Sequence, residues 1–392
     1  MNMKKRSWIL IITSVLCLAF LCIGTLVTPE VGFSENENRY LQAAPKLTVD
    51  HVLNGRFETQ AEDYLNDQII GRSLWVRTMA MTEAALGVGD INGVYLAADG
   101  RVVKRVTEAD FDWERYQKNL REAAALAAHC EENGSKLYAM LVPTAAYVYQ
   151  QDLPSHAMRF DEDRAFADAA DALGDRLIDL RAAMQVAVTD GSAARESADG
   201  GVFFRTDHHW TSLGAYYASA AYCRANGIEP RSINEYKTVR TDGYIGSMYS
   251  FCGKPKPECL KSNPDSTIGR LPAASYTMTY TRDGTDYAGS AINEKASGYM
   301  MFICGDQPYT KIVTQNKTGK KLLVFKESFG NAFVPYMIDY YDEIYVVDIR
   351  ETTPSTSAII ADKGITDVLF INNVFAAADA NQIQRVAAKA AS

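Results

Sequence analysis

The sequence predicts an α/β fold of three layers, in which a parallel β-sheet carries helices on both faces. Short apolar runs bounded by turn-forming residues predict buried strands at 136–143, 176–180, 321–325, 343–349 and 367–371. Helical stretches lie between these runs, at 161–173, 211–226, 329–341 and 355–363. Strands that alternate with helices indicate a parallel sheet covered on both faces, because parallel neighbours need long crossover connections.

An apolar segment precedes this pattern. Residues 8–27 contain no charged side chain, and Lys4, Lys5 and Arg6 come directly before them. About 20 apolar residues span the hydrocarbon core of a membrane, and the basic flank places the N-terminus in the cytoplasm. We therefore expect a single-pass signal anchor in the cell membrane, with residues 30–392 extracytoplasmic. A cleaved signal peptide is the alternative, although its apolar core is usually shorter and ends at small residues.

Three regions are expected along the chain. Residues 1–29 form a cytoplasmic tip and transmembrane anchor, 30–105 a stalk with a helix and a hairpin, and 106–392 the main domain. Residues 231–320 interrupt the alternation of strands and helices and are rich in Gly, Pro, Ser, Thr and Tyr. They predict an irregular, β-rich insertion, which in such folds often builds part of a substrate cleft.

The sequence also predicts the elements that precede the first strand of the sheet. The spacing of apolar residues predicts a helix within 51–86, and residues 108–132 predict a second helix rich in Ala and Leu. Residues 94–103 predict a hairpin, because Asp99-Gly100 is a pair that tight turns favour.

Composition excludes several classes of protein. With 392 residues, 47% hydrophobic and 22% charged, the chain is neither disordered nor collagenous. Its 40 basic and 48 acidic residues give a net charge of −8, so no nucleic-acid partner is expected. The cysteines outside the apolar segment lack the spacing of a structural zinc site. Cys252 and Cys259 could close a disulfide in an oxidising compartment, or all of these cysteines are ordinary buried thiols.

The first candidate catalytic residues lie in the sequence FFRTDHHWTSLGAYYA at 203–218. Asp207 lies two residues before His209, and Thr211 is placed to cap a following helix. A carboxylate at this spacing can reach the imidazole, select its tautomer and stabilise the imidazolium formed during proton transfer. In an extended segment alternate side chains share a side, so we expect His208 to face away. A structural role for the pair is the alternative.

The second candidate is Ser328, in KLLVFKESFGNAF at 321–333. An apolar strand ends at Phe325, and a helix begins within two residues after the serine. A nucleophilic serine suits this turn, because the carboxyl edge of the sheet exposes its oxygen and backbone N–H groups at a helix start can bind an oxyanion. Alternatively, Ser328 only caps the helix.

With the Thr-Asp-His-His-Trp-Thr string, the Ser-Phe-Gly-Asn block and the apolar N-terminus, the chain resembles the DHHW family of bacterial envelope proteins. That family is similar to the SGNH-hydrolase-like proteins of alginate O-acetylation, and the similarity runs over most of residues 50–375. The resemblance implies a three-layer α/β/α SGNH-hydrolase-like fold. It also implies that Ser328 is the nucleophile, His209 the base and Asp207 its orienting partner.

Two features depart from the family pattern. The acetylation proteins usually carry Gly-Asp-Ser, whereas this chain has Lys326-Glu327-Ser328. A separate glycine block that supplies an oxyanion donor is not identifiable. Asn331 is the candidate we select for that role, with Asn372 and Asn373 as further possibilities, and each is equally plausible as a turn or cap residue.

Three other residues are substrate or oxyanion candidates. Arg205 binds a substrate carboxylate or pairs with a surface acid, and we favour the second. Thr144 follows a predicted strand and lies at the same sheet edge as Ser328 if the strands are parallel. Trp210 lines a sugar-binding face or packs under the helix, and packing is favoured.

These observations predict a membrane-anchored serine acyl-ester enzyme, an O-acetyltransferase or acetylesterase that acts on an envelope or secreted polysaccharide. By resemblance, a membrane partner delivers the acyl groups. No cofactor and no metal are expected. A non-catalytic glycan-binding or scaffold protein of an acetylation system is the alternative. A metal phosphoesterase, which Asp-His-His also suggests, is disfavoured because it needs further Asp and His ligands.

Overall fold

The structure, a computed structural model, describes residues 3–34, 39–53, 55–86, 89–91, 93–189, 200–252, 264–351 and 356–379. The chain forms two compact units. One contains residues 1–94 and 249–261, and the other contains residues 95–248 and 262–392.

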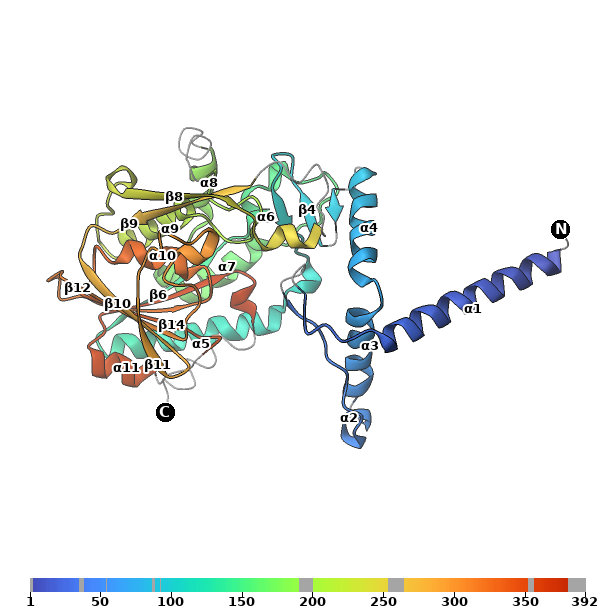
Figure 1. Cartoon of the computed structure of the whole chain (residues 1–392). Helices are drawn as coiled ribbons and strands as arrows, with labels where there is room; N and C mark the ends of the chain where they lie inside the picture. The colour runs from blue at the N-terminus through green and yellow to red at the C-terminus, as the bar shows by residue number, and fades with distance from the viewer. Residues whose placement is uncertain are drawn as a thin grey trace. The chain divides into compact units, whose positions relative to one another are not determined.

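The first unit is mainly helical (Figure 1). Its helices are α1 Met3–Val27, α2 Val49–Leu53, α3 Arg56–Gln68 and α4 Arg72–Ala85, and its short strands are β1 Phe33–Ser34, β2 Arg39–Tyr40 and β3 Asp90–Ile91. Within α1, Trp8–Thr25 is long and apolar enough to cross a membrane, a property that signal sequences share. The helix expected within 51–86 is divided, because Gly55 and Gly71 adopt positive φ values of 75° and 71°.

The second unit contains an eight-stranded mixed sheet in the order β11-β10-β12-β14-β13-β15-β6-β7. The strands are β6 Lys136–Val142, β7 Leu177–Asp179, β10 Tyr276–Arg282, β11 Thr285–Gly289, β12 Tyr309–Thr314, β13 Lys321–Lys326, β14 Glu343–Asp348 and β15 Asp367–Asn373. The neighbours from β14 to β7 pair in parallel, so the five strands predicted from apolar runs are confirmed. The other three strands, from within 231–320, pair antiparallel. The α/β fold class is therefore confirmed, with a sheet that is parallel-rich.

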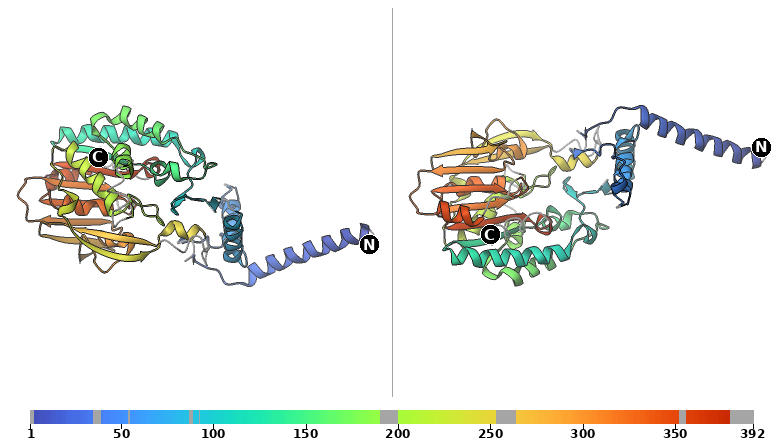
Figure 2. Two further views of the ribbon diagram at one scale, coloured as in Figure 1. Left: turned by 90° about the horizontal axis from the view of Figure 1, so that it is seen from above. Right: turned by 90° about the horizontal axis from the view of Figure 1, so that it is seen from below.

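Helices cover both faces of this sheet (Figure 2). They are α5 Trp113–Glu132, α7 Glu162–Leu173 and α11 Thr356–Lys363 on one face, and α8 Arg181–Thr189, α9 Ser212–Ala225 and α10 Gly330–Met337 on the other. Alternate residues of β13 enter the two cores: Leu322 and Val324 pack with α9 and α10, whereas Leu323 and Phe325 pack with α5 and α7. Each such buried side chain contributes about 1.5–3 kcal/mol to folding.

Smaller elements complete the chain. Those within the second unit are β5 Val102–Lys104, the short helix α6 Ala145–Val148, the strands β8 Lys237–Tyr244 and β9 Asp265–Leu271, and the 3₁₀ segment η7 Gly298–Met301. The strand β4 Val94–Leu96 and the 3₁₀ segment η5 Ser247–Cys252 each contain a boundary between the two units. The predicted turn at Asp99-Gly100 is confirmed, since Gly100 has a φ of 82° and its N–H donates to the Ala97 carbonyl. Cys259 lies outside the described residues, so its disulfide with Cys252 stays a prediction.

The parallel strands determine where a site can form. In parallel neighbours the carboxyl ends meet at one edge of the sheet, where ligands of open α/β sheets bind. β13 ends two residues before Ser328, β6 ends two residues before Thr144, and β15 ends at Asn373. Ser328, Thr144 and Asn373, three of the candidate site residues from the sequence, therefore lie along the carboxyl edge of the parallel strands.

Candidate active site

Asp207, His209 and Ser328 form a continuous chain of hydrogen bonds. Nδ1 of His209 lies 2.6 Å from Oδ1 of Asp207, and Nε2 lies 2.7 Å from Oγ of Ser328. All three residues are buried. The structure thus brings together the carboxylate, imidazole and hydroxyl in the order that activates a serine nucleophile.

The histidine is positioned by a tight loop that leads into α9. Phe203 and Trp210 form an antiparallel bridge, and the Phe204 N–H donates to the His209 carbonyl at 3.1 Å. At the helix start, the Gly214 N–H donates to Oγ1 of Thr211 at 3.4 Å, which confirms the predicted cap. The loop thereby fixes Asp207 and His209 directly before the start of the buried helix α9.

His208 does not face away, so that prediction was wrong. The chain bends at residues 205–209 instead of running as an extended strand, which removes the alternation of side chains on which the prediction depended. The His208 ring centroid lies 3.8 Å from that of His209, and Nδ1 lies 3.5 Å from Oδ1 of Asp207. Its side chain is 41% exposed, and it lines the pocket described below.

Residues from the 231–320 segment hold the Asp207 carboxylate. Oδ2 accepts hydrogen bonds from the Tyr244 hydroxyl at 2.9 Å, the Ser247 N–H at 2.9 Å and the Ser247 hydroxyl at 3.1 Å. Burial alone would raise the pKa of Asp207, but the attraction and hydrogen bond of His209, with His208 and the Ser247 N–H, lower it well below its ordinary value. A Cβ at Gly246 would lie 2.3 Å from the Asp207 Cβ, so only glycine allows this approach.

Aromatic side chains cover the imidazole. The Tyr299 ring stacks on His209 with centroids 3.8 Å apart and planes 9° apart. The Trp210 indole N–H donates to the Tyr299 hydroxyl at 3.1 Å and to the Phe329 carbonyl at 3.0 Å. Trp210 is 0% exposed, so it packs under the site, which is the role that the sequence favoured, and it presents no face to a sugar.

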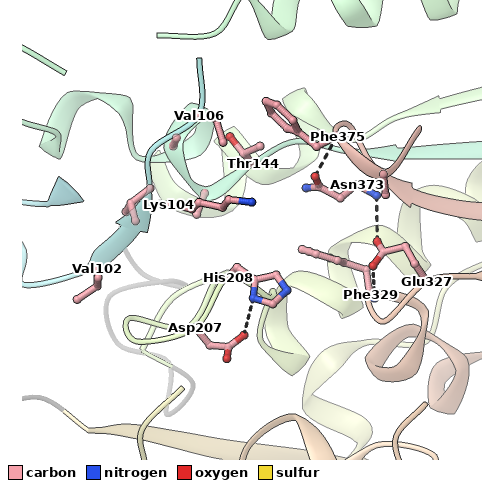
Figure 3. Close-up of a pocket in the computed structure, with 14 residues that line it drawn as sticks. Val102, Lys104, Val106, Thr144, Asp207, His208, Glu327, Phe329, Asn373 and Phe375 are labelled. Carbon is pink, nitrogen blue, oxygen red and sulfur yellow. Dashed lines mark hydrogen bonds and ion pairs between the residues drawn. The ribbon is translucent and has the colours of Figure 1, made fainter. Parts of the chain in front are cut away.

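A pocket of about 200 Å³ opens beside this triad (Figure 3). Its lining is mostly apolar with a few polar groups: Val102, Val103, Lys104, Val106, Thr144, Ala145, Ala146, Asp207, His208, Glu327, Phe329, Asn373, Phe375 and Ala376. An apolar cavity with a few polar side chains at its base is typical of small-molecule sites. Asn373, a possible oxyanion residue in the sequence, reaches the pocket, and Asn372 is buried without lining it.

Thr144 lies in this pocket, as its place after a parallel strand indicated. The buried Glu162 carboxylate accepts the Thr144 N–H at 2.9 Å and also the Thr144 hydroxyl. Burial raises the pKa of Glu162 to about 7, although these two hydrogen bonds oppose the rise. Thr144 is thus held in a fixed orientation at the pocket wall.

Asn331 and Arg205 are directed elsewhere. Nδ2 of Asn331 donates to Oδ1 of Asp306 at 2.8 Å, and the same oxygen accepts from Nζ of the buried Lys326 at 2.9 Å. Arg205 lines a different cavity, with Arg101, Tyr149 and other residues, and its backbone N–H donates to Asp265. Neither residue lines the pocket beside Ser328. The selection of Asn331 as the oxyanion residue is therefore wrong, and so is the less favoured alternative in which Arg205 binds substrate there.

Asp207, His208 and His209 also form a cluster of potential metal ligands, with the ligand atoms within 4.8 Å of one another. Both ring nitrogens of His209 already contact Asp207 and Ser328. An ion would therefore have to break the hydrogen-bond chain to gain its third ligand. The donor set fits the triad better than a metal centre.

Several residues of the site have no signal in the sequence. Tyr244, Ser247 and Tyr299 belong to the segment 231–320, which was predicted as a β-rich insertion of the kind that often builds part of a cleft, but no motif marks these individual residues. Glycine at 246 is the one hint, because a glycine in a polar loop can mark a close backbone approach.

Comparisons with known proteins agree with this architecture. The model of the family described as DHHW protein matches residues 127–347, more than half of the chain. A crystal structure of a DHHW family protein from Eubacterium siraeum is 32% identical, with a TM-score of 0.61, and the match covers 77% of this chain and 96% of that one.

Two more distant structures are also similar. Bacillus cereus PatB1 with a sulfonyl adduct is 17% identical, with a TM-score of 0.61 and coverage of 75% of this chain and 98% of that one. The O-acetyltransferase domain of Pseudomonas putida AlgJ is 18% identical, with a TM-score of 0.44 and coverage of 74% and 94%. No curated protein matches the sequence. From the family model and the Eubacterium siraeum structure together, the chain belongs to the DHHW family.

Proposed function

We propose that this protein is a serine acyl-ester enzyme, an O-acetyltransferase or acetylesterase that acts on an envelope or secreted polysaccharide. The observation that carries the proposal is the hydrogen-bond chain from Asp207 through His209 to Ser328. The motif resemblance to alginate O-acetylation proteins supports the choice of an acetyl group and a glycan. In this proposal α1 is the membrane anchor, residues 106–392 form the catalytic domain, and a membrane acyltransferase supplies the acyl groups.

The first half-reaction forms an acyl-enzyme. Oγ of Ser328 attacks the carbonyl carbon of an acetyl ester while Nε2 of His209 accepts the hydroxyl proton. The tetrahedral intermediate then collapses, the bond to the donor alcohol breaks, and His209 returns the proton to the departing oxygen. Asp207 stabilises the imidazolium between these two proton transfers.

The second half-reaction releases the acetyl group. A sugar hydroxyl attacks the acyl carbon and gives its proton to Nε2 of His209. Collapse of the second intermediate transfers the acetyl group to the sugar and returns the proton to Ser328. Water in place of the sugar gives acetate, which is the esterase outcome.

The shape of the site supports small acyl groups. Val106, Ala146 and Phe375 are among the apolar residues of the pocket, and His208 and Asn373 supply polar groups. The Tyr299 ring stacks on the imidazole and the Phe329 ring lies 5.2 Å from it, centroid to centroid, which keeps water from the imidazole. Exclusion of water strengthens the electrostatic interactions on which the triad depends.

The test is acylation of the full-length protein in detergent by an activated acetyl ester. Mass spectrometry is expected to find one acetyl group on Ser328, no adduct in Ser328→Ala, and an unchanged adduct in Ser135→Ala, a buried serine hydrogen-bonded to Ile365. Addition of oligosaccharides then separates transfer from hydrolysis. Glycan binding without any adduct would instead support the scaffold alternative and refute the enzyme.

A further inference from the structure

Glu327 places a carboxylate directly against the proposed nucleophile. Its side chain is buried, and Oε2 lies 3.0 Å from Oγ of Ser328. The same oxygen accepts the Phe329 N–H at 3.4 Å, and Oε1 accepts the Asn373 N–H at 3.1 Å (Figure 3). One side chain thus engages the serine hydroxyl and two backbone donors at the carboxyl edge of the sheet.

Two acceptors compete for a single hydrogen. A serine hydroxyl has one O–H to donate. Nε2 of His209, at 2.7 Å, needs that hydrogen bond to act as the base, whereas Oε2 of Glu327 lies at 3.0 Å from the same oxygen. While the hydroxyl donates to Glu327, His209 cannot withdraw its proton, so this arrangement lowers the reactivity of Ser328.

The carboxylate also occupies the place that an acyl group needs. Backbone N–H groups beside the nucleophile are the donors that stabilise an oxyanion during acyl transfer. Here the Phe329 and Asn373 N–H groups are bound to the Glu327 oxygens. A carboxylate and an ester group have similar planar shapes, so an ester reaches Ser328 only after Glu327 moves.

Lys104 offers a second position for this carboxylate. It lies at the end of β5, lines the same pocket and points into it (Figure 3). Among the ion pairs of the described residues, none includes Lys104. An unpaired ammonium in the pocket would attract a Glu327 carboxylate displaced from the serine.

We propose that Glu327 occupies the acyl-oxygen site of the resting protein and that Lys104 receives its carboxylate when an acyl ester enters. The inference concerns regulation of the proposed active site and rests on the proposed function. The inference also explains why this chain has Lys-Glu-Ser in place of Gly-Asp-Ser, because the residue before the nucleophile then controls the access of an ester to Ser328.

The experiment measures the rate of Ser328 acylation by an activated acetyl ester in the full-length protein. Glu327→Ala is expected to raise this rate about tenfold, since a hydrogen bond to a charged acceptor is removed from the nucleophile. Lys104→Met is expected to lower the rate several-fold in the wild-type background, with a much smaller effect on Glu327→Ala. Lys136→Met, on the exposed start of β6, is the matched control.

Three outcomes would overturn the inference. Slower acylation of a folded Glu327→Ala variant would make Glu327 an assisting residue, and an equal effect of Lys104→Met in both backgrounds would place Lys104 on the substrate. Absence of any Ser328 adduct in every variant would remove the proposed function itself. If Glu327→Ala does not fold, Glu327→Gln is the second variant. Its amide has one acceptor oxygen and cannot accept from Ser328, Phe329 and Asn373 as the carboxylate does, so its resting position is weakened. It is expected to acylate faster than wild type and to be insensitive to Lys104→Met.

Discussion

Substitution of Asp207 by Asn tests the proposed triad at its most connected residue. The two carboxylate oxygens receive five hydrogen bonds from the described residues. Oδ1 accepts the His209 N–H and Nδ1–H, and Oδ2 accepts the Tyr244 hydroxyl and the Ser247 N–H and hydroxyl. An amide has only one acceptor oxygen, so it can satisfy only one of these two groups of donors.

Both orientations of the amide carry a cost. With its oxygen toward His209, the NH₂ group faces the Ser247 N–H, and the neutral amide no longer stabilises the imidazolium. With its NH₂ group toward His209, the His209 N–H loses its acceptor and the ring adopts the wrong tautomer. One orphaned buried donor costs about 1–3 kcal/mol of stability. Loss of the aspartate charge is expected to lower the acylation rate by about 10³- to 10⁴-fold.

The pH dependence of stability gives an independent readout. The folded-state pKa of Asp207 lies well below its ordinary value, and an unfolded aspartate has a pKa of about 3.9. The ionised carboxylate therefore contributes stability that is fully present above about pH 4 and is lost as the pH falls through the folded-state pKa. Asn does not ionise, so the stability difference between wild type and Asp207→Asn is expected to shrink on acidification.

The assay combines stopped-flow acylation at pH 7 with denaturant unfolding at pH 7 and pH 3. Asp339→Asn is the matched control, because Asp339 also accepts two backbone N–H groups and lies outside the site. It is expected to lose stability and keep acylation. Acylation of Asp207→Asn within tenfold of wild type, or a stability difference that grows at low pH, would refute this account of the triad.

Four further outcomes are expected. His209→Ala is expected to slow acylation by orders of magnitude and His208→Ala much less, and the reverse order would show that His208 is the base. The folded-state pKa of Glu162 is about 7, so ionisation of this carboxyl is expected to lower the stability of the wild type by about 3 kcal/mol between pH 4.5 and 7. Glu162→Gln is expected to abolish this fall, and an unchanged dependence of stability on pH would contradict the assignment. Acylation is expected to survive treatment with a chelator, and loss of activity restored by a metal ion would contradict the triad. Protease added to intact spheroplasts is expected to digest the protein, and protection until lysis would contradict the extracytoplasmic placement.

The sequence by itself determined the local elements and the candidate site residues Asp207, His209 and Ser328. Apolar runs of strand length predicted β6, β13 and β15, because strands buried on both faces need continuous hydrophobic residues. The turn positions of Asp207 and Ser328 next to helix starts were equally local, since caps and turns depend on residues within a few positions. These local patterns can be interpreted without knowledge of contacts between residues that are far apart in the sequence.

Tertiary structure decided what surrounds those groups. Ser328 and His209 are 119 residues apart, and only the packing of α9 and α10 on one sheet face brings them to 2.7 Å. Tyr244 and Ser247 reach Asp207 from an insertion with no periodic pattern, so no local rule predicts their orientation. The direction of the His208 side chain could not be predicted locally either, because a bend in the backbone at 205–209 removes the alternation of side chains that an extended segment would have. Local propensity determines which elements form, whereas long-range packing determines which side chains meet.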